Sequence, residues 1–177
     1  IIIIASLLIK LTDGGPILFC QTRIGRSGRP FSLYKFRSMV TNAEELKHEL
    51  KGLNEHPYDR TFKILNDPRI TKVGRVLRRL SVDEFPQFWN VLRGDMSLVG
   101  PRPSVPSEVA LYQPDDFERL AVKPGLTCIW QISGRSNLAF EQQLELDLQY
   151  IHRRNLLLDL WILLKTVPVV ILGDGAA

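Results

Sequence analysis

The first nine residues of the chain, IIIIASLLI, are almost wholly apolar, and this apolar run stops at Lys10. A helix of this length spans roughly 14 Å, which is about half of the ~30 Å hydrocarbon core of a bilayer. The segment can therefore enter a membrane but cannot cross one. It lacks the basic flank and the small-residue cleavage site of a signal peptide, so we do not interpret it as one. The alternative is a strand or helix end buried in an ordinary protein core.

A second apolar segment, residues 156–173, is interrupted by Asp159, Lys165 and Pro168. An uninterrupted span would need about 20 apolar residues, so this segment is not predicted to be a transmembrane helix. It fits a helix lying on a membrane surface with Trp161 at the boundary. It fits a helix packed in the protein core equally well.

The charge is distributed unevenly along the chain. Residues 1–103 contain 17 Lys and Arg against 10 Asp and Glu, whereas residues 104–177 contain 6 against 9. A basic half points to an anionic partner such as phosphate, a membrane surface or nucleic acid, although a solvated basic face would look the same. The two cysteines form no CxxC motif and the three histidines no HxxxH or HExxH pair, which argues against a disulfide framework and a zinc site.

The pattern of apolar residues predicts one domain of the α/β (α+β) class. Residues 16–24 and 31–39 are rich in β-branched and aromatic residues and flank a basic five-residue loop, which predicts an antiparallel hairpin. Residues 42–51 follow as a short helix that Asn42 can cap, and the polar residues 52–68 as a loop.

Residues 70–80 predict an amphipathic basic helix. One face carries apolar side chains and the other carries Lys and Arg without the Glu partners that usually balance them. Such a helix suits anionic lipid or a bound phosphate. The apolar face is formed by Ile70, Val73, Leu77 and Leu80, and the basic one by Lys72, Arg75 and Arg79, with Arg78 alongside.

A further helix begins near Ser81, either with Ser81 and Glu84 as a capping box or with Asp83 as the cap and Pro86 in the first turn. Both starts place Asp83 and Glu84 at the N-terminus of the helix, where ionised carboxylates and bound phosphate are favoured. The two acids either only cap the helix or have a chemical role. The apolar stripe of this helix is Phe85, Phe88, Trp89 and Leu92.

Residues 93–103 predict a loop punctuated by Gly and Pro, in which Pro101 and Pro103 restrict the backbone around Arg102. A rigidly held Arg suits bidentate recognition of phosphate, and a stiff surface turn is the alternative. Residues 122–136 contain a turn, a short strand and a second Gly-Arg pair. Residues 140–153 predict a helix on which Asp147 and Tyr150 are neighbours.

Three segments together resemble the bacterial sugar transferases, also called monotopic phosphoglycosyl transferases. They are GPILFCQTRIGRSGRPFSLYKFRSM, DPRITKVGRVLRRLSVDEFPQFWNVLRGDMSLVGPRP and KPGLTCIWQISGR. The resemblance runs from about residue 10 to residue 173. It implies transfer of a sugar-1-phosphate from a UDP-sugar to a polyprenol phosphate at the cytoplasmic face of the inner membrane, releasing UMP and starting the synthesis of a surface glycan. The family requires Mg²⁺.

The resemblance also implies roles for particular residues. Asp83 and Glu84 match the catalytic pair of the family, and we expect Asp83 to be the nucleophile that forms an aspartyl-phosphosugar intermediate. Glu84 is expected to hold Mg²⁺, with Asp147 a weaker candidate for the same role. The expected substrate-binding residues are Lys35, Arg78, Pro101, Arg102, Pro103 and Arg135.

The expected organisation is a remnant of a membrane-inserted, reentrant helix at residues 1–12 and a catalytic domain at residues 13–177. The chain does not begin with Met and resembles the larger, glycan-priming members, so we expect it to be the catalytic portion of a longer protein. It departs from the family in lacking the Ser-Pro break of the reentrant helix, in having Cys128 where many relatives have Gly, and in having Phe85 after the pair.

The expected partners are the UDP-sugar, the polyprenol phosphate and membrane lipid, without nucleic acid. The alternative is a non-catalytic module that binds a membrane surface or nucleic acid through the basic helix at 69–80. A binding module has no use for paired carboxylates inside a basic face. The identity of the sugar, the glycan pathway and the formation of a homo-oligomer stay open.

Overall fold

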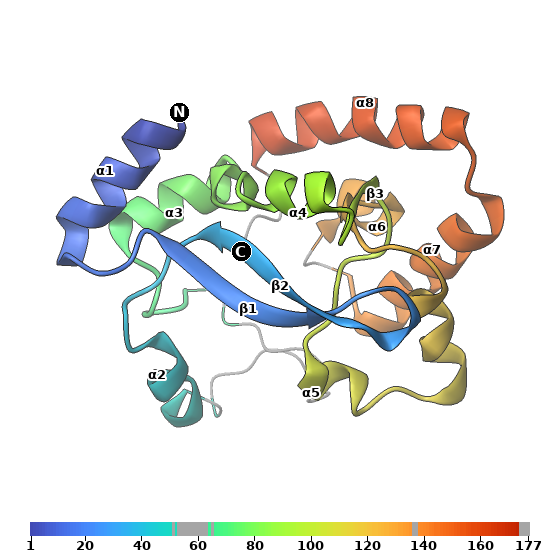
Figure 1. Ribbon diagram of the computed structural model, residues 1–177, viewed down its shortest axis with the longest axis horizontal. Helices are drawn as coiled ribbons and strands as arrows, with labels where there is room; N and C mark the ends of the chain where they lie inside the picture. The colour runs from blue at the N-terminus through green and yellow to red at the C-terminus, as the bar shows by residue number, and fades with distance from the viewer. Residues whose placement is uncertain (51, 53–63, 65, 136–137, 174–177) are drawn as a thin grey trace.

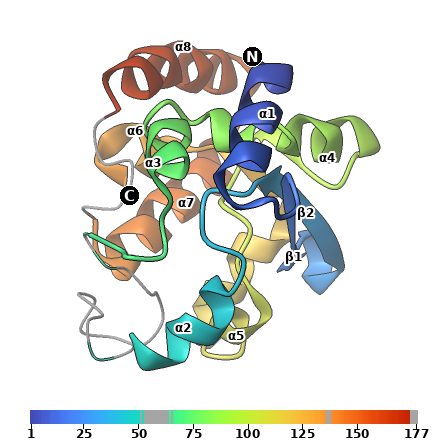
Figure 2. The same ribbon diagram turned by 90° about the vertical axis from the view of Figure 1, so that its left-hand side faces the viewer.

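A computed structural model describes residues 1–50, 52, 64, 66–135 and 138–173, so most of the loop predicted at 52–68 lies outside the described residues. A two-stranded antiparallel hairpin lies along one face of the molecule (Figure 2), with α1, α3, α4 and α8 above it and α2 and α5 below it in the view of Figure 1. The elements are α1 (Ile2–Asp13), β1 (Leu18–Ile24), η1 (Arg26–Gly28), β2 (Pro30–Phe36), α2 (Ala43–Glu49), α3 (Lys72–Arg79), η3 (Val82–Glu84), α4 (Gln87–Arg93), β3 (Ser97–Val99), α5 (Pro106–Val109), η4 (Pro114–Ala121), β4 (Gly125–Thr127), α6 (Ile129–Ser133), α7 (Phe140–Arg153) and α8 (Leu156–Leu172). This mixed α/β architecture with a small antiparallel sheet confirms the fold class predicted from the sequence.

The hairpin of β1 and β2 brings two basic side chains onto one face. Phe19 pairs with Lys35, and Arg23 pairs with Phe31. Because side chains alternate between the faces of a strand and paired residues share a face, Arg23 and Lys35 point to the same side. The strands are shorter than predicted at the outer ends, and the basic loop between them forms the turn η1 with Ser27 in the left-handed region (φ 58°).

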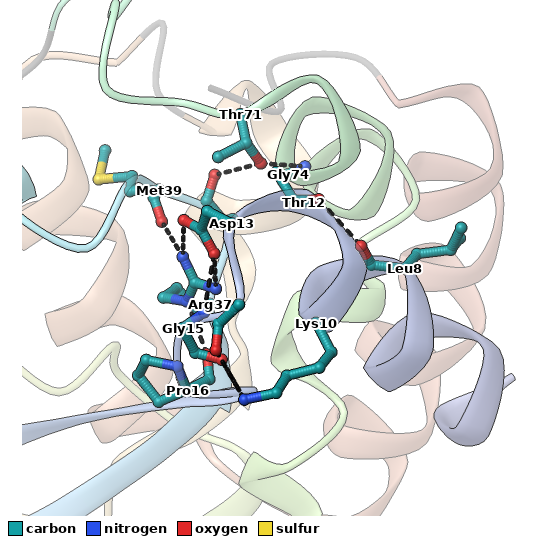
Figure 3. Close-up of polar contacts among 12 residues, drawn as sticks. Leu8, Lys10, Thr12, Asp13, Gly15, Pro16, Arg37, Met39, Thr71 and Gly74 are labelled. Carbon is teal, nitrogen blue, oxygen red and sulfur yellow. Dashed lines mark hydrogen bonds and ion pairs between the residues drawn. The ribbon is translucent and has the colours of Figure 1, made fainter.

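The apolar N-terminal segment is a helix anchored to the hairpin at its C-terminal end (Figure 3). The buried Arg37 guanidinium binds both oxygens of the Asp13 carboxylate and donates to the Pro16 carbonyl at 2.6 Å. One side of α1 packs on the core through Ala5 and Ile9, each 3% exposed. Most of its other apolar side chains are exposed: Ile2, Ile3, Ile4, Leu7, Leu8 and Leu11.

The basic helix α3 begins two residues later than predicted because Thr71 caps it, its hydroxyl accepting from the Gly74 amide at 2.9 Å. A Cβ at Gly74 would lie 1.9 Å from the Ser38 carbonyl oxygen, so only glycine permits this approach of the helix to the chain after β2. Leu77 is buried as predicted, but Leu80 is 46% exposed and does not belong to the buried face.

Neither capping arrangement predicted for the next helix is present. The backbone at Ser81 is left-handed (φ 52°) and its side chain makes no capping bond. A 3₁₀ turn, η3, carries Asp83 and Glu84, and α4 starts only after Pro86. A helix starting at Ser81 would need an N–H from Pro86 in its second turn, and proline has none.

The helix α4 is fixed to the hairpin by Asn90, which is wholly buried. Its amide nitrogen donates to the Ser32 carbonyl at 2.7 Å, and its amide oxygen accepts from the Tyr34 amide at 3.1 Å. The side chain therefore continues the hydrogen bonding of β2 beyond its free edge. Phe88, Trp89 and Leu92, predicted as an apolar stripe, are 49%, 57% and 79% exposed.

Residues 97–99 form a short strand rather than part of the predicted loop. Here β3 pairs in parallel with β4, with Ser97 opposite Gly125 and Val99 opposite Thr127. The helices α6, α7 and α8 pack around this pair, and Cys128, Trp130, Tyr150 and Ile162 form the core there.

The C-terminal helix α8 lies at the surface of the molecule (Figure 1). Its Ile162 is completely buried, whereas eight of its apolar side chains are exposed: Leu156, Leu157, Leu160, Trp161, Leu164, Val167, Ile171 and Leu172. Within the described ranges, no helix combines the length and the hydropathy that crossing a membrane requires.

Candidate active site

The Asp83–Glu84 pair lies on the turn η3, which packs against both α3 and β2. The Asp83 side chain is buried, with 6% of its surface exposed, and the Glu84 side chain is 30% exposed. The turn thus places one carboxylate inside the protein and the adjacent one at its surface.

The environment of Asp83 combines burial with surrounding positive charge. Burial and the neighbouring Glu84 raise the pKa of the Asp83 carboxyl, while Lys35, Arg78 and Arg102 act in the opposite direction. In the described part of the chain, no hydrogen bond or ion pair engages the Asp83 carboxylate. Its oxygens are therefore available for a reaction partner.

Two arginines adjoin the pair from different elements. Arg102 follows β3, and its Nη1 lies 3.7 Å from the Glu84 Oε1. Arg78 comes from the last turn of α3 and donates from Nε to the Ser38 hydroxyl at 2.9 Å, and burial lowers the pKa of its guanidinium. Asp83 is the acidic group that acts most strongly on Arg78, which is half-buried, unlike the exposed Lys72, Arg75 and Arg79 of the same helix.

A small pocket, open to solvent, adjoins Glu84 and Arg102. Burial, Arg102 and Arg23 lower the pKa of Lys35 to about 8, although Asp83 and Glu84 oppose the shift. The residues lining the pocket are Arg23, Leu33, Lys35, Glu84, Gln87, Arg102, Pro103, Gly125, Leu126 and Gln131.

Sequence reasoning missed Arg23, which also lines this pocket. Its guanidinium donates to the Pro103 carbonyl at 2.8 Å and to the Gln21 side chain at 2.7 Å. Burial, together with the charge of Arg102, lowers the pKa of Arg23 to about 10. The register of the hairpin could have identified Arg23. Lys35 pairs with Phe19, which lies on the same face of β1 as Arg23, so the two basic side chains share a face.

The two prolines act through the backbone. The Pro101 carbonyl accepts from the Gly125 amide at 3.0 Å, and the Pro103 carbonyl accepts from Arg23. Pro103 lines the pocket, while both prolines border a second hollow behind Arg102. Their role is to hold the segment that carries Arg102.

Asp147 lies apart from this group, and Arg135 does not line the pocket. Asp147 is completely buried, and its carboxylate lies 2.6 Å from the guanidinium of the buried Arg119. Its helix α7 packs against α6 and η4 rather than against η3. Arg135 follows α6 with a left-handed backbone (φ 50°) and does not line the pocket. The structure therefore separates Asp147 from Glu84 and gives it an arginine as its partner.

The described residues contain no cluster of three or more His, Cys, Asp or Glu side chains that would enclose a metal ion. Asp83 and Glu84 nevertheless supply two adjacent carboxylates beside a pocket lined with cations. Mg²⁺ commonly binds through one or two carboxylates, with substrate phosphate and water completing its coordination. The pair therefore fits Mg²⁺ that arrives with a phosphate-bearing substrate.

Comparison with known proteins gives matches along almost the whole chain. Residues 1–173 match the family described as bacterial sugar transferase. The chain is 50% identical to galactosyl transferase CpsE of Streptococcus agalactiae, over 93% of this chain and 36% of that protein. It is 46% identical to an undecaprenyl-phosphate galactose phosphotransferase of Salmonella typhimurium, over 99% of this chain and 39% of that protein.

A shorter relative is covered more fully. The exopolysaccharide production protein ExoY of Rhizobium meliloti is 43% identical, over 96% of this chain and 76% of that protein. The chain thus spans well under half of the first two relatives and about three quarters of the third. These matches, together with the paired carboxylates among arginines, show that the chain belongs to the bacterial sugar transferase family.

Proposed function

We propose that this domain transfers a sugar-1-phosphate from a UDP-sugar to a polyprenol phosphate, releasing UMP and forming a polyprenyl-diphospho-sugar. The observation that carries the proposal is Asp83, a buried carboxylate without a partner among the described residues and surrounded by Lys35, Arg78 and Arg102. A nucleotide diphosphate carries negative charge that these cations can stabilise. The name of the Salmonella typhimurium relative points to undecaprenyl phosphate as the acceptor.

In the first step, a carboxylate oxygen of Asp83 attacks the sugar-proximal phosphorus. The bond from this phosphorus to the bridging oxygen breaks, and UMP leaves with that oxygen and its electron pair. In the second step, a phosphate oxygen of the polyprenol phosphate attacks the same phosphorus and displaces the Asp83 carboxylate. The enzyme returns to its starting state after each cycle.

The raised pKa of Asp83 suits the role of nucleophile, because a carboxylate that is poorly stabilised by its surroundings is more reactive. Lys35, Arg78 and Arg102 reduce the repulsion between this carboxylate and the diphosphate. Glu84 would hold Mg²⁺. The ion would neutralise phosphate charge when bound with the substrate. Catalysis then rests on positioning and on charge stabilisation.

We propose that the exposed apolar side chains of α1, α4 and α8 contact the membrane. These helices lie on the same side of the hairpin in both views (Figures 1 and 2). The turn η3 lies between α3 and α4, so a lipid-linked phosphate at this face is near Asp83. The basic side chains Lys72, Arg75 and Arg79 on α3 would meet anionic headgroups. The cytoplasmic face of the inner membrane is the expected location.

A purely binding module would use the same basic helix but gives no role to Asp83. The two functions are distinguished by measuring UMP release from a panel of UDP-sugars, beginning with UDP-galactose, with and without undecaprenyl phosphate. Transferase activity requires sustained UMP release with the acceptor and, in its absence, at most about one UMP per enzyme apart from slow hydrolysis. Mass spectrometry after incubation with the UDP-sugar alone should find a phosphosugar adduct on the peptide containing Asp83. Absence of UMP release from every UDP-sugar would refute the proposal.

A further inference from the structure

A chain of buried polar contacts links α7 to the segment that carries Arg102. The Asp147 carboxylate lies 2.6 Å from Arg119 on η4, and Arg119 donates from Nη1 to the Tyr112 hydroxyl at 3.2 Å. The Tyr112 hydroxyl in turn lies 2.7 Å from the Ser104 hydroxyl. All four side chains are at least nine-tenths buried.

The direction of these hydrogen bonds follows from the chemistry of the groups. A guanidinium only donates, so the Tyr112 oxygen accepts from Arg119, and the Tyr112 proton remains free to donate to Ser104. The charge on Arg119 polarises this hydroxyl and strengthens the bond that it donates. The contact on Ser104 is therefore the end of a charge-assisted chain that starts at Asp147.

The segment at residues 101–104 depends on hydrogen bonds for its position. Its carbonyls at Pro101, Pro103 and Ser104 accept from Gly125, Arg23 and Ile24, respectively. A small hollow lies behind it, bordered by the segment itself and by Tyr112 and Arg119. Each of these bonds fixes one point of the segment, so losing one of them lets the backbone shift at that point.

We infer that Tyr112 and Arg119 are positioning residues that hold the Ser104 end of this segment and thereby orient Arg102 towards Glu84 and the diphosphate. The inference rests on the function proposed above. It also gives Asp147 a role, since its carboxylate fixes Arg119 at the other end of this series of polar contacts. Arg102 itself is 43% exposed beside Glu84, so its orientation depends on the backbone that carries it.

The test is Tyr112→Phe, which removes one oxygen and keeps the ring that packs against Phe117 and Phe140. We expect kcat for UMP release to fall about tenfold with KM changed less than about twofold, because a misplaced guanidinium loses mainly transition-state stabilisation. Ser104→Ala cuts the same bond from the other side and should give the same loss, so the test does not depend on one variant.

A double-mutant cycle separates positioning from general destabilisation. In an Arg102→Ala background, Tyr112→Phe should change kcat by less than about twofold. The control is Thr166→Val, which removes a partly buried hydroxyl pair of similar length, 2.8 Å, between α8 and β4. It should lower the Tm comparably and leave kcat unchanged.

The inference is overturned if Tyr112→Phe and Ser104→Ala retain wild-type kcat, or if their losses add fully to that of Arg102→Ala. Failure of the proposed function would look different, because the wild-type protein itself would then release no UMP from any UDP-sugar.

Discussion

The alkaline limit of activity should be set by Lys35, and Lys35→Arg should remove it. Burial and two arginines lower the pKa of this lysine to about 8 from an ordinary 10.5. At pH 9 a lysine with this pKa is only about one-tenth protonated, whereas an ordinary lysine would be about 97% protonated. If the ammonium group helps to hold the diphosphate, the free enzyme loses a required charge between pH 7 and pH 9.

The parameter to measure is kcat/KM for the UDP-sugar between pH 6 and pH 10, because its pH dependence reports groups of the free enzyme. We expect it to fall about tenfold per pH unit above about pH 8 in the wild-type protein. In Lys35→Arg the fall that begins near pH 8 should be absent, since a guanidinium holds its proton to a higher pH than this lysine. The wild-type limit in kcat should lie at higher pH, because bound diphosphate stabilises the ammonium form.

Lys123→Arg is the matched control, since Lys123 is exposed and lies outside the pocket lining. It should keep the wild-type pH profile. A profile in Lys35→Arg that still falls near pH 8, or a wild-type profile that is flat to pH 10, would contradict this assignment.

Three further outcomes are expected. Asp83→Asn should lower turnover about a thousandfold or more and abolish the adduct, which mass spectrometry would measure. It should also raise the Tm at neutral pH in a thermal unfolding experiment, because a carboxyl whose pKa is raised in the folded state destabilises the fold when it is ionised. EDTA should stop turnover and Mg²⁺ should restore it, whereas full activity in EDTA would exclude a metal from the mechanism. In a metal titration of UMP release, Glu84→Gln should need more Mg²⁺ for its residual activity. Trp89→Glu on the apolar face of α4 should reduce cosedimentation with lipid vesicles, whereas Leu111→Glu, after α5 on the opposite side of the hairpin, should not; equal losses would argue against the proposed membrane face.

The elements that could be predicted from the sequence are those with local signals. The hairpin follows from two β-rich runs around a short basic loop, and α7 follows from helical periodicity that matches its bounds, Phe140–Arg153. The pair of β3 and β4 could not be found in this way. Each strand has three residues, and the two are joined only through a long intervening stretch that includes α5 and η4. A pairing of this kind depends on tertiary packing, which local periodicity does not encode.

The residues of the site also differ in whether a single stretch of sequence reveals them. The turn at Asp83 and the segment at Arg102 are each recognisable from one stretch of sequence, and the structure brings them together with Lys35 and Arg78. Arg23 reaches the pocket only through strand register. Register has to be worked out from both strands together, so a pass along one strand at a time does not reveal it.

Asp83 and Asp147 show why a buried carboxylate cannot be given a role from its own segment. Both are buried aspartates, but Asp147 faces Arg119 at 2.6 Å, whereas Asp83 has cations near it and no bound partner among the residues described. A carboxylate with an arginine at 2.6 Å has its charge paired within the protein. One surrounded by more distant cations keeps its lone pairs available for a phosphorus atom. The chemical difference between the two therefore comes from η4, an element that the spacing of residues on α7 could not have revealed.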